Sequence, residues 1–210
     1  MKFSTVKLLL VCGILAALIY IGSDIAAALS WEGYRYTDQS VSELRAIGSP
    51  TRSFLMPILS IYAMLEISFG FGVWKVANKK RSLLITSILL IALGILDSMG
   101  SIFSLNINEA AGSVTNNIHM AVTIITVLFI FLIIGFGATA YKKWFLFYSI
   151  GTILTLIVSG FVSFLNIQKF AAQQQGSWLG IVERINIYGY MLWVMVFAIV
   201  LLRSRPLPSK

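Results

Sequence analysis

Residues Ile118–Tyr141 read IHMAVTIITVLFIFLIIGFGATAY, a run of 24 residues without Asp, Glu, Lys or Arg. At a rise of about 1.5 Å per residue, a helix of this length measures about 36 Å, which exceeds the roughly 30 Å hydrocarbon core of a bilayer. Membrane-crossing β-strands need only about 10 residues and alternate in polarity, whereas this run is apolar on every face. The segment therefore predicts a transmembrane helix.

Similar apolar runs lie on both sides of this segment. They cover Lys7–Leu29, Ser53–Val76, Ser82–Leu105, Trp144–Asn166 and Val182–Leu202. With 58% hydrophobic and 11% charged residues and a mean hydropathy of +0.88, the chain has more apolar surface than a globular fold can bury. We predict an all-α membrane protein, a six-helix transmembrane bundle that forms one domain over residues 1–210.

The charged residues divide by membrane side. The predicted connections and ends on one side contain only basic residues: Lys2, Lys7, Lys75, Lys79, Lys80, Arg81, Lys142, Lys143, Arg203, Arg205 and Lys210. The other side mixes acidic and basic residues. The positive-inside rule therefore predicts cytoplasmic N- and C-termini in the plasma membrane. This division explains the net charge of +8 better than nucleic-acid binding does, so membrane lipid is the expected partner and nucleic acid is not.

Two features of the first half of the chain leave alternatives open. Lys2 and Lys7 before an apolar core would also suit a cleaved signal peptide, but the run continues past Asp24, so we expect a retained helix. Gly70-Phe71-Gly72 is followed about 65 residues later by Gly135-Phe136-Gly137, which fits duplication of a helical hairpin. Independent selection of small residues at helix interfaces would give the same pattern.

The long connection Ser30–Arg52 contains a local helix start. Ser40 is followed three residues later by Glu43, the spacing of a capping box, and Gly48-Ser49-Pro50 then disfavours a helix. We therefore expect a short ordered helix in this loop.

Ionisable side chains at membrane depth cost free energy and often mark functional sites. Seven residues in the half away from the cytoplasm are predicted to bind a ligand: Asp24, Glu43, Arg52, Asp97, His119, Glu183 and Arg184. We expect them to line one polar cavity that binds or moves a polar lipid or small molecule, with arginine recognising an anionic group. Glu66 lies apart, nearer the cytoplasmic half, where it would be protonated or serve in proton coupling.

Two other functions remain open. An intramembrane lipid hydrolase would use His119, with Asp97 and Ser98 as further catalytic candidates. One histidine in the chain disfavours a zinc site, and we predict no metal and no cofactor. A structural or accessory subunit would use the same side chains only to bond helices together. We expect a binding protein rather than an enzyme.

Three segments carry a resemblance to a known family: SVSELRAIGSPTRSF at Ser40–Phe54, NIHMAV at Asn117–Val122, and GIVER at Gly180–Arg184. They resemble the bacterial and archaeal membrane proteins called domain of unknown function 998. Arg45 departs from the glycine frequent in that family, and Phe103-Ser104 departs from Phe-Pro. The resemblance implies six membrane helices and no assigned activity. It implies matching polar positions at Ser42, Glu43, His119, Glu183 and Arg184.

Overall fold

The computed structural model describes residues 3–141, 143–165, 176 and 178–203. The described residues form α1 (Phe3–Ser30), α2 (Val41–Leu44), α3 (Arg52–Val76), α4 (Arg81–Ser98), α5 (Val114–Ala138), α6 (Lys143–Leu165) and α8 (Leu179–Arg203). All of these except α2 are long and apolar enough to cross a membrane, and no strand is present in the described part. The all-α prediction with six spans is confirmed. Five residues named in the predictions lie outside the described residues: Lys2, Lys142, Asn166, Arg205 and Lys210.

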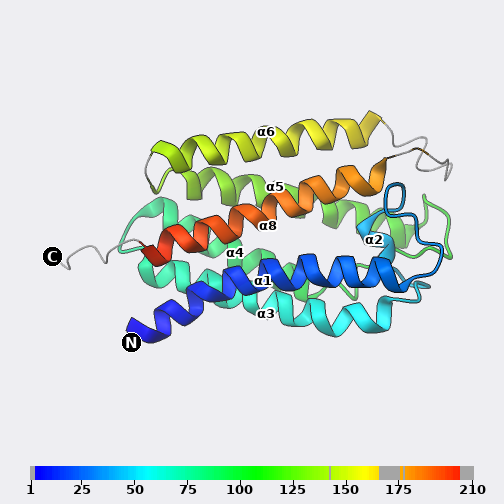
Figure 1. Cartoon of the computed structure of the whole chain (residues 1–210), viewed down its shortest axis with the longest axis horizontal. Helices are drawn as coiled ribbons and strands as arrows, with labels where there is room; N and C mark the ends of the chain where they lie inside the picture. Colours follow the sequence, from blue (N-terminus) through cyan, green and yellow to red (C-terminus); the bar gives the residue numbers. More distant parts are fainter. Residues whose placement is uncertain (1–2, 142, 166–175, 177, 204–210) are drawn as a thin grey trace.

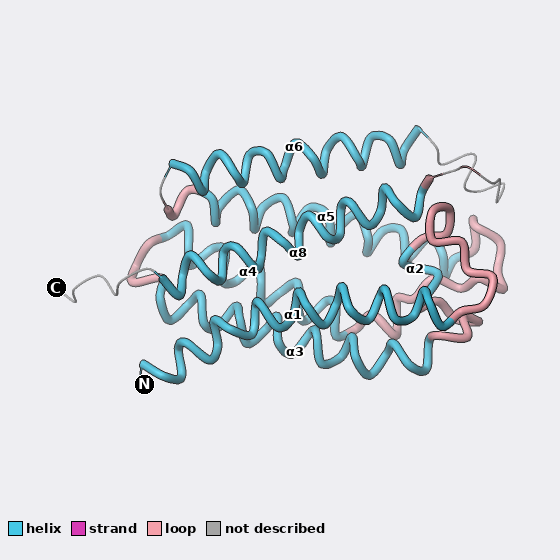
Figure 2. The backbone as a smooth tube through the Cα atoms, in the orientation of Figure 1, coloured by secondary structure: helices cyan, strands magenta, loops and turns pink. Residues whose placement is uncertain are grey.

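The six long helices run side by side along the long axis of the molecule (Figure 1). The start of α1 and the end of α8 lie at the same end of the bundle, whereas α2 lies at the opposite end. Most of the loop backbone also gathers around α2 (Figure 2). We call this end the α2 end.

An aromatic cluster joins α8 to α6 in the core. The Trp193 and Phe197 rings stack with centroids 4.9 Å apart, and Phe145 packs 5.7 Å from each of them. All three side chains are fully buried. Trp193 Nε1 donates to Ser149 Oγ at 2.9 Å, so the indole nitrogen is satisfied inside the apolar core.

Glycines bring α3 and α4 into close contact. A Cβ placed on Gly70 would lie 2.7 Å from Ile91 Cγ1, and one placed on Gly94 would lie 2.7 Å from Ile67 Cγ1. Small residues of this kind allow membrane helices to approach until their backbones touch. Gly135, which the repeat pattern pairs with Gly70, has open space around it. Common origin of the two hairpins stays a prediction.

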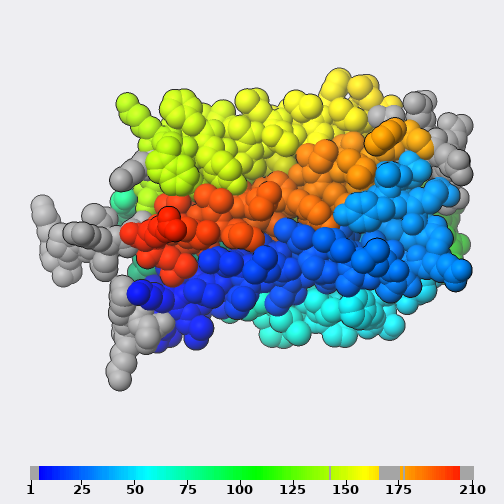
Figure 3. All heavy atoms as spheres, in the orientation of Figure 1, coloured from blue at the N-terminus to red at the C-terminus, as the bar shows by residue number. Residues whose placement is uncertain are grey.

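Large apolar side chains cover the outside of the bundle. Leu8, Met64, Ile124, Phe147 and Val158 are each more than 60% exposed. One face is formed by α1, α8 and α6 lying next to one another (Figure 3). Because such a surface is unfavourable in water, these helices are in contact with lipid.

The prediction that the third span continues to Leu105 is wrong, because α4 ends at Ser98. Residues 99–103 turn instead, and Leu105 pairs with the loop after α2. Its carbonyl accepts the N–H of Ile47 at 2.7 Å, and Ile107 N–H donates to Ile47 O at 3.1 Å. This backbone pairing draws the chain out of the helix. Ser113 then caps α5, which starts four residues before the predicted Ile118.

Candidate functional site

Hydrogen bonds within its own loop and to α8 hold the short helix α2 in place. Ser40 Oγ accepts the N–H of Glu43, and Glu43 Oε2 accepts the N–H of Ser40 at 2.8 Å, which confirms the capping box. Burial raises the pKa of the Glu43 carboxyl, although the bond from Ser40 opposes the shift. Glu183 of α8 accepts Val41 N–H at 2.8 Å and the Ser42 hydroxyl at 3.2 Å. Glu183 therefore fixes the outer loop to α8.

An ion pair beside this loop joins the first and last helices. Arg184 Nε lies 2.9 Å from Asp24 Oδ2, and Arg184 Nη2 lies 3.2 Å from Asp24 Oδ1. Both side chains are nearly fully buried. Tyr188 also donates to Asp24 Oδ2. Asp24 is therefore bonded by two residues of α8.

Every N–H of the Arg184 guanidinium has an acceptor. Besides Asp24, it donates to Tyr36 O at 2.9 Å, Gly180 O at 3.1 Å and Tyr34 Oη at 3.0 Å, and its Cζ lies 3.6 Å from the Tyr36 ring centroid. Guanidinium has five N–H donors, and these contacts use all five. Burial raises the pKa of the Tyr34 hydroxyl, which stays neutral beside Arg184. A ligand of Arg184 would have to displace one of these bonds.

Arg52 and His119 hold the loop that follows α4. Arg52 Nη1 donates to Arg45 O at 2.7 Å and Ser104 Oγ at 2.8 Å. His119 Nδ1 lies 2.8 Å from Phe103 O, the geometry of a ring N–H donor to a carbonyl. Ser98 is exposed and donates to Ile95 O in its own helix. Among the described residues, neither His119 nor Ser98 bonds to a carboxylate.

Asp97 belongs to a different group of residues. Its half-buried carboxyl lies within hydrogen-bonding reach of the Glu66 carboxyl, and Tyr62 lies near both. Tyr190 of α8 donates to Glu66 Oε1 at 3.2 Å. Their places in the sequence predict that Glu66 lies apart from Asp97, whereas the structure brings the two side chains together. Pairing across antiparallel helices depends on their register, which the sequence does not reveal.

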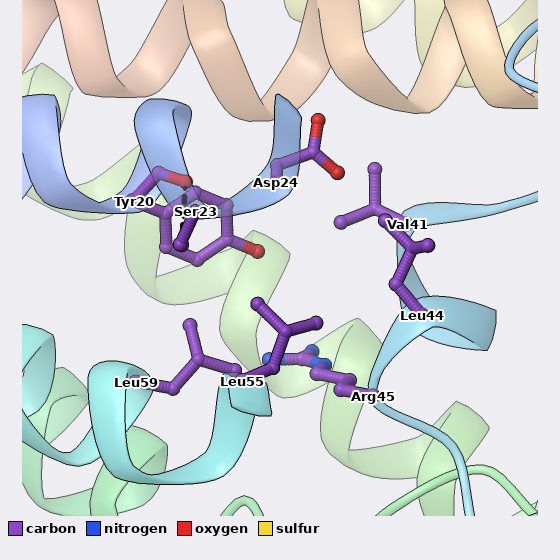
Figure 4. A pocket seen from close by; sticks show the side chains of 8 residues that line it. All are labelled: Tyr20, Ser23, Asp24, Val41, Leu44, Arg45, Leu55 and Leu59. Atoms are coloured by element: carbon purple, nitrogen blue, oxygen red, sulfur yellow. Dashed lines mark hydrogen bonds between the residues drawn. The ribbon is translucent and has the colours of Figure 1, made fainter. Parts of the chain in front are cut away.

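Arg45 is the residue that the sequence analysis did not select. It follows α2 directly, and its half-buried side chain enters a small pocket between α1, α2 and α3 (Figure 4). The lining residues are Tyr20, Ser23, Asp24, Val41, Leu44, Arg45, Leu55 and Leu59. The signal that could have identified Arg45 was its position at the end of the capped helix, where the family frequently has glycine.

The charge of Arg45 is maintained by its surroundings. Burial alone lowers the pKa of its guanidinium, but the side chains of Tyr20 and then Asp97 raise it. Among the described residues, no hydrogen bond or ion pair of 4 Å or less joins this side chain to a partner. Arg45 is therefore a cation in a pocket with unused N–H donors.

The predicted site residues are divided among several networks. Three pairs of these residues each hold part of the α2 end: Asp24 with Arg184, Glu43 with Glu183, and Arg52 with His119. Asp97 pairs with Glu66 instead. In the described residues, no group of three or more His, Cys, Asp or Glu side chains is arranged to hold a metal ion. Ligand binding by the seven predicted residues stays a prediction.

Comparison with known proteins identifies the family. The chain matches the family model described as protein of unknown function (DUF998) over residues 14–200, so it belongs to that family. No curated protein and no solved structure matches the chain.

Proposed function

We propose that this DUF998 protein binds an anionic group, carried by a polar lipid or a small molecule, through Arg45. The observation that supports this proposal is the guanidinium in the pocket with no hydrogen-bonded partner among the described residues. Guanidinium forms paired hydrogen bonds with carboxylate and phosphate, and such charged bonds are stronger than neutral ones. An anion is therefore the ligand class that would satisfy Arg45.

The acidic residue that lines the pocket does not occupy Arg45, so the guanidinium is available to a ligand. Asp24 lines the same pocket, but its carboxylate accepts both Arg184 and Tyr188. In Figure 4 its carboxyl points away from Arg45. Arg184 thus neutralises the acid that would otherwise compete for Arg45.

The pocket would take one group of a ligand rather than a whole molecule. Its cavity volume is about 10 Å³, about enough for one water-sized group, whereas sites that enclose a small molecule measure roughly 300–1,000 Å³. Leu55 and Leu59 form its apolar side on α3, and the lipid-contacting surface of the bundle could accommodate acyl chains. A head group that inserts one phosphate or carboxylate oxygen fits these properties.

Binding to the purified protein tests the proposal. We expect native mass spectrometry to show a more persistent complex with phosphatidylglycerol than with phosphatidylcholine, and Arg45→Gln to weaken it about tenfold or more. Loss of a charged hydrogen bond typically costs about 1.5–3 kcal/mol, which supports that magnitude. Inorganic phosphate in a parallel titration distinguishes a free anion from a lipid head group.

Arg35→Gln is the matched control. Arg35 lies at the same end of the molecule, and its side chain is 44% exposed and 3.7 Å from Asp38. If Arg35→Gln and Arg45→Gln weaken binding equally, the attraction is nonspecific and the proposal is wrong. Equal binding by wild type and Arg45→Gln would also contradict it.

The same proposal includes the orientation in the plasma membrane. The end opposite α2 has the described basic residues Lys75, Lys79, Lys80, Arg81, Lys143 and Arg203. No acidic residue of the chain lies in the connections or termini at that end. This asymmetry supports a cytoplasmic location for both termini, with the Arg45 pocket on the other side of the membrane.

A further inference from the structure

The packing of α3 against α4 sets two acids side by side within the membrane. A Cβ on Gly94 would lie 3.2 Å from Ala63 O and 2.7 Å from Ile67 Cγ1, so this level of α4 touches α3 directly. Residues three apart share a helix face, which directs Asp97 toward α3 and Glu66 toward α4. Their carboxyl groups lie within hydrogen-bonding reach of each other.

One oxygen of this pair has no hydrogen-bond partner. Glu66 is only 3% exposed, and its Oε1 accepts the hydroxyl of Tyr190. Its Oε2 is fully buried and has no donor among the described residues. A buried carboxylate oxygen without a donor is costly, particularly at membrane depth. Two ionised carboxylates have no hydrogen atom to donate to each other.

We propose that Glu66 and Asp97 form a proton-binding site inside the membrane, in which the two carboxyl groups share one proton and hold one negative charge. Two ionised carboxylates this close repel each other strongly in a medium of low dielectric constant. One shared proton removes that repulsion and supplies the donor that the pair lacks. This inference does not depend on the proposed anion site.

The surroundings balance the single remaining charge. Tyr62 of α3 lies near both carboxyl groups without a hydrogen bond to either, and the Tyr190 hydroxyl of α8 donates to Glu66 Oε1. Tyr20 of α1 packs against Tyr62 with ring centroids 5.0 Å apart. The positive charge that acts on Asp97 is Arg45, located toward the α2 end.

Infrared spectroscopy of the purified protein in nanodiscs tests the site directly. A protonated carboxyl has a C=O stretch that is separate from carboxylate bands and shifts in D₂O. We expect wild type to show such a band at neutral pH and Glu66→Gln to lack it. Asp97→Asn should shift or remove the band, because it replaces the group that shares the proton.

Glu43→Gln is the control, since Glu43 is also buried but accepts a backbone N–H at the α2 end. It should leave the band unchanged. The proposal is wrong if wild type has no such band, if the band persists in Glu66→Gln, or if Asp97→Asn leaves its frequency unaltered. Size-exclusion profiles and circular dichroism show that each variant is folded. Where Glu66→Gln does not fold, Asp97→Asn provides the test.

Discussion

Two arginines at the α2 end have opposite roles because their surroundings differ. Arg184 uses all five N–H groups inside the protein, on Asp24, Tyr34 and backbone carbonyls. The Arg45 side chain makes no hydrogen bond with the described residues, and its surroundings raise the pKa of its guanidinium although burial opposes this. The first is suited to holding helices together, and the second to binding an anion.

Removing one member of the buried ion pair should destabilise the protein strongly. We expect Asp24→Asn to lower the free energy of unfolding by about 3–5 kcal/mol, because it leaves the Arg184 charge buried without its counter-ion. Adding Arg184→Gln to Asp24→Asn should restore part of the loss. Unfolding by detergent titration in mixed micelles measures these differences.

Arg35→Gln serves as the comparison, since the Arg35–Asp38 pair is exposed on the arginine side. It should cost less than about 1 kcal/mol. An equally small effect of Asp24→Asn would show that the buried pair does not stabilise the bundle.

The sequence identified most polar residues of the α2 end but not how they pair. Glu43 and Ser40 are three residues apart, so their capping box followed from local spacing. Asp24 and Arg184 are separated by 160 residues, and only helix packing determines that they meet. Arg45 was missed because its significance comes from lacking a partner, a property of the folded arrangement.

At the scale of helices, the glycine contacts between α3 and α4 control how near Glu66 and Asp97 can approach. The six long helices were predictable because hydrocarbon requires long apolar runs. The residue at which α4 ends was not predictable, because the backbone pairing of Leu105 and Ile107 with Ile47 competes with further helical turns. Hydrophobicity continues through this region, so it does not mark the boundary.

Gly70 and Gly135 provide a matched pair of substitutions. Gly70→Ala should destabilise the protein by about 1–3 kcal/mol, because the new Cβ would meet the backbone of α4 as well as Ile91. Gly135→Ala has open space and should be neutral or slightly stabilising, since alanine favours helix. Melting temperatures in one detergent compare them. Equal losses would contradict the close contact of α3 with α4.

At the scale of the whole molecule, six crossings would put both termini on one side of the membrane, and the basic residues support the proposal that this side is cytoplasmic. Cys12 is the chain's one cysteine and is buried in α1, so a Cys12→Ser background allows single introduced cysteines to report topology. Suitable positions are Gly112, with open space around it, and Lys79, which is exposed at the opposite end.

We expect a membrane-impermeant maleimide to label Gly112→Cys in intact cells and to label Lys79→Cys only after the membrane is opened. Labelling in the reverse order would show that the termini face outward and that the Arg45 pocket faces the cytoplasm. Labelling of both in intact cells would contradict an odd number of crossings between them.

The bonds at the α2 end also set an order for assembly. Asp24, Val41 and Ser42 are synthesised early, yet their partners Glu183 and Arg184 come about 140–160 residues later. Until α8 inserts, a nascent chain holds an acid near the membrane surface without its counter-ion, and the first loop without its anchor. Completion of the fold therefore depends on the last helix, and a chain interrupted before it would present an unpaired charge to the cell's quality-control machinery.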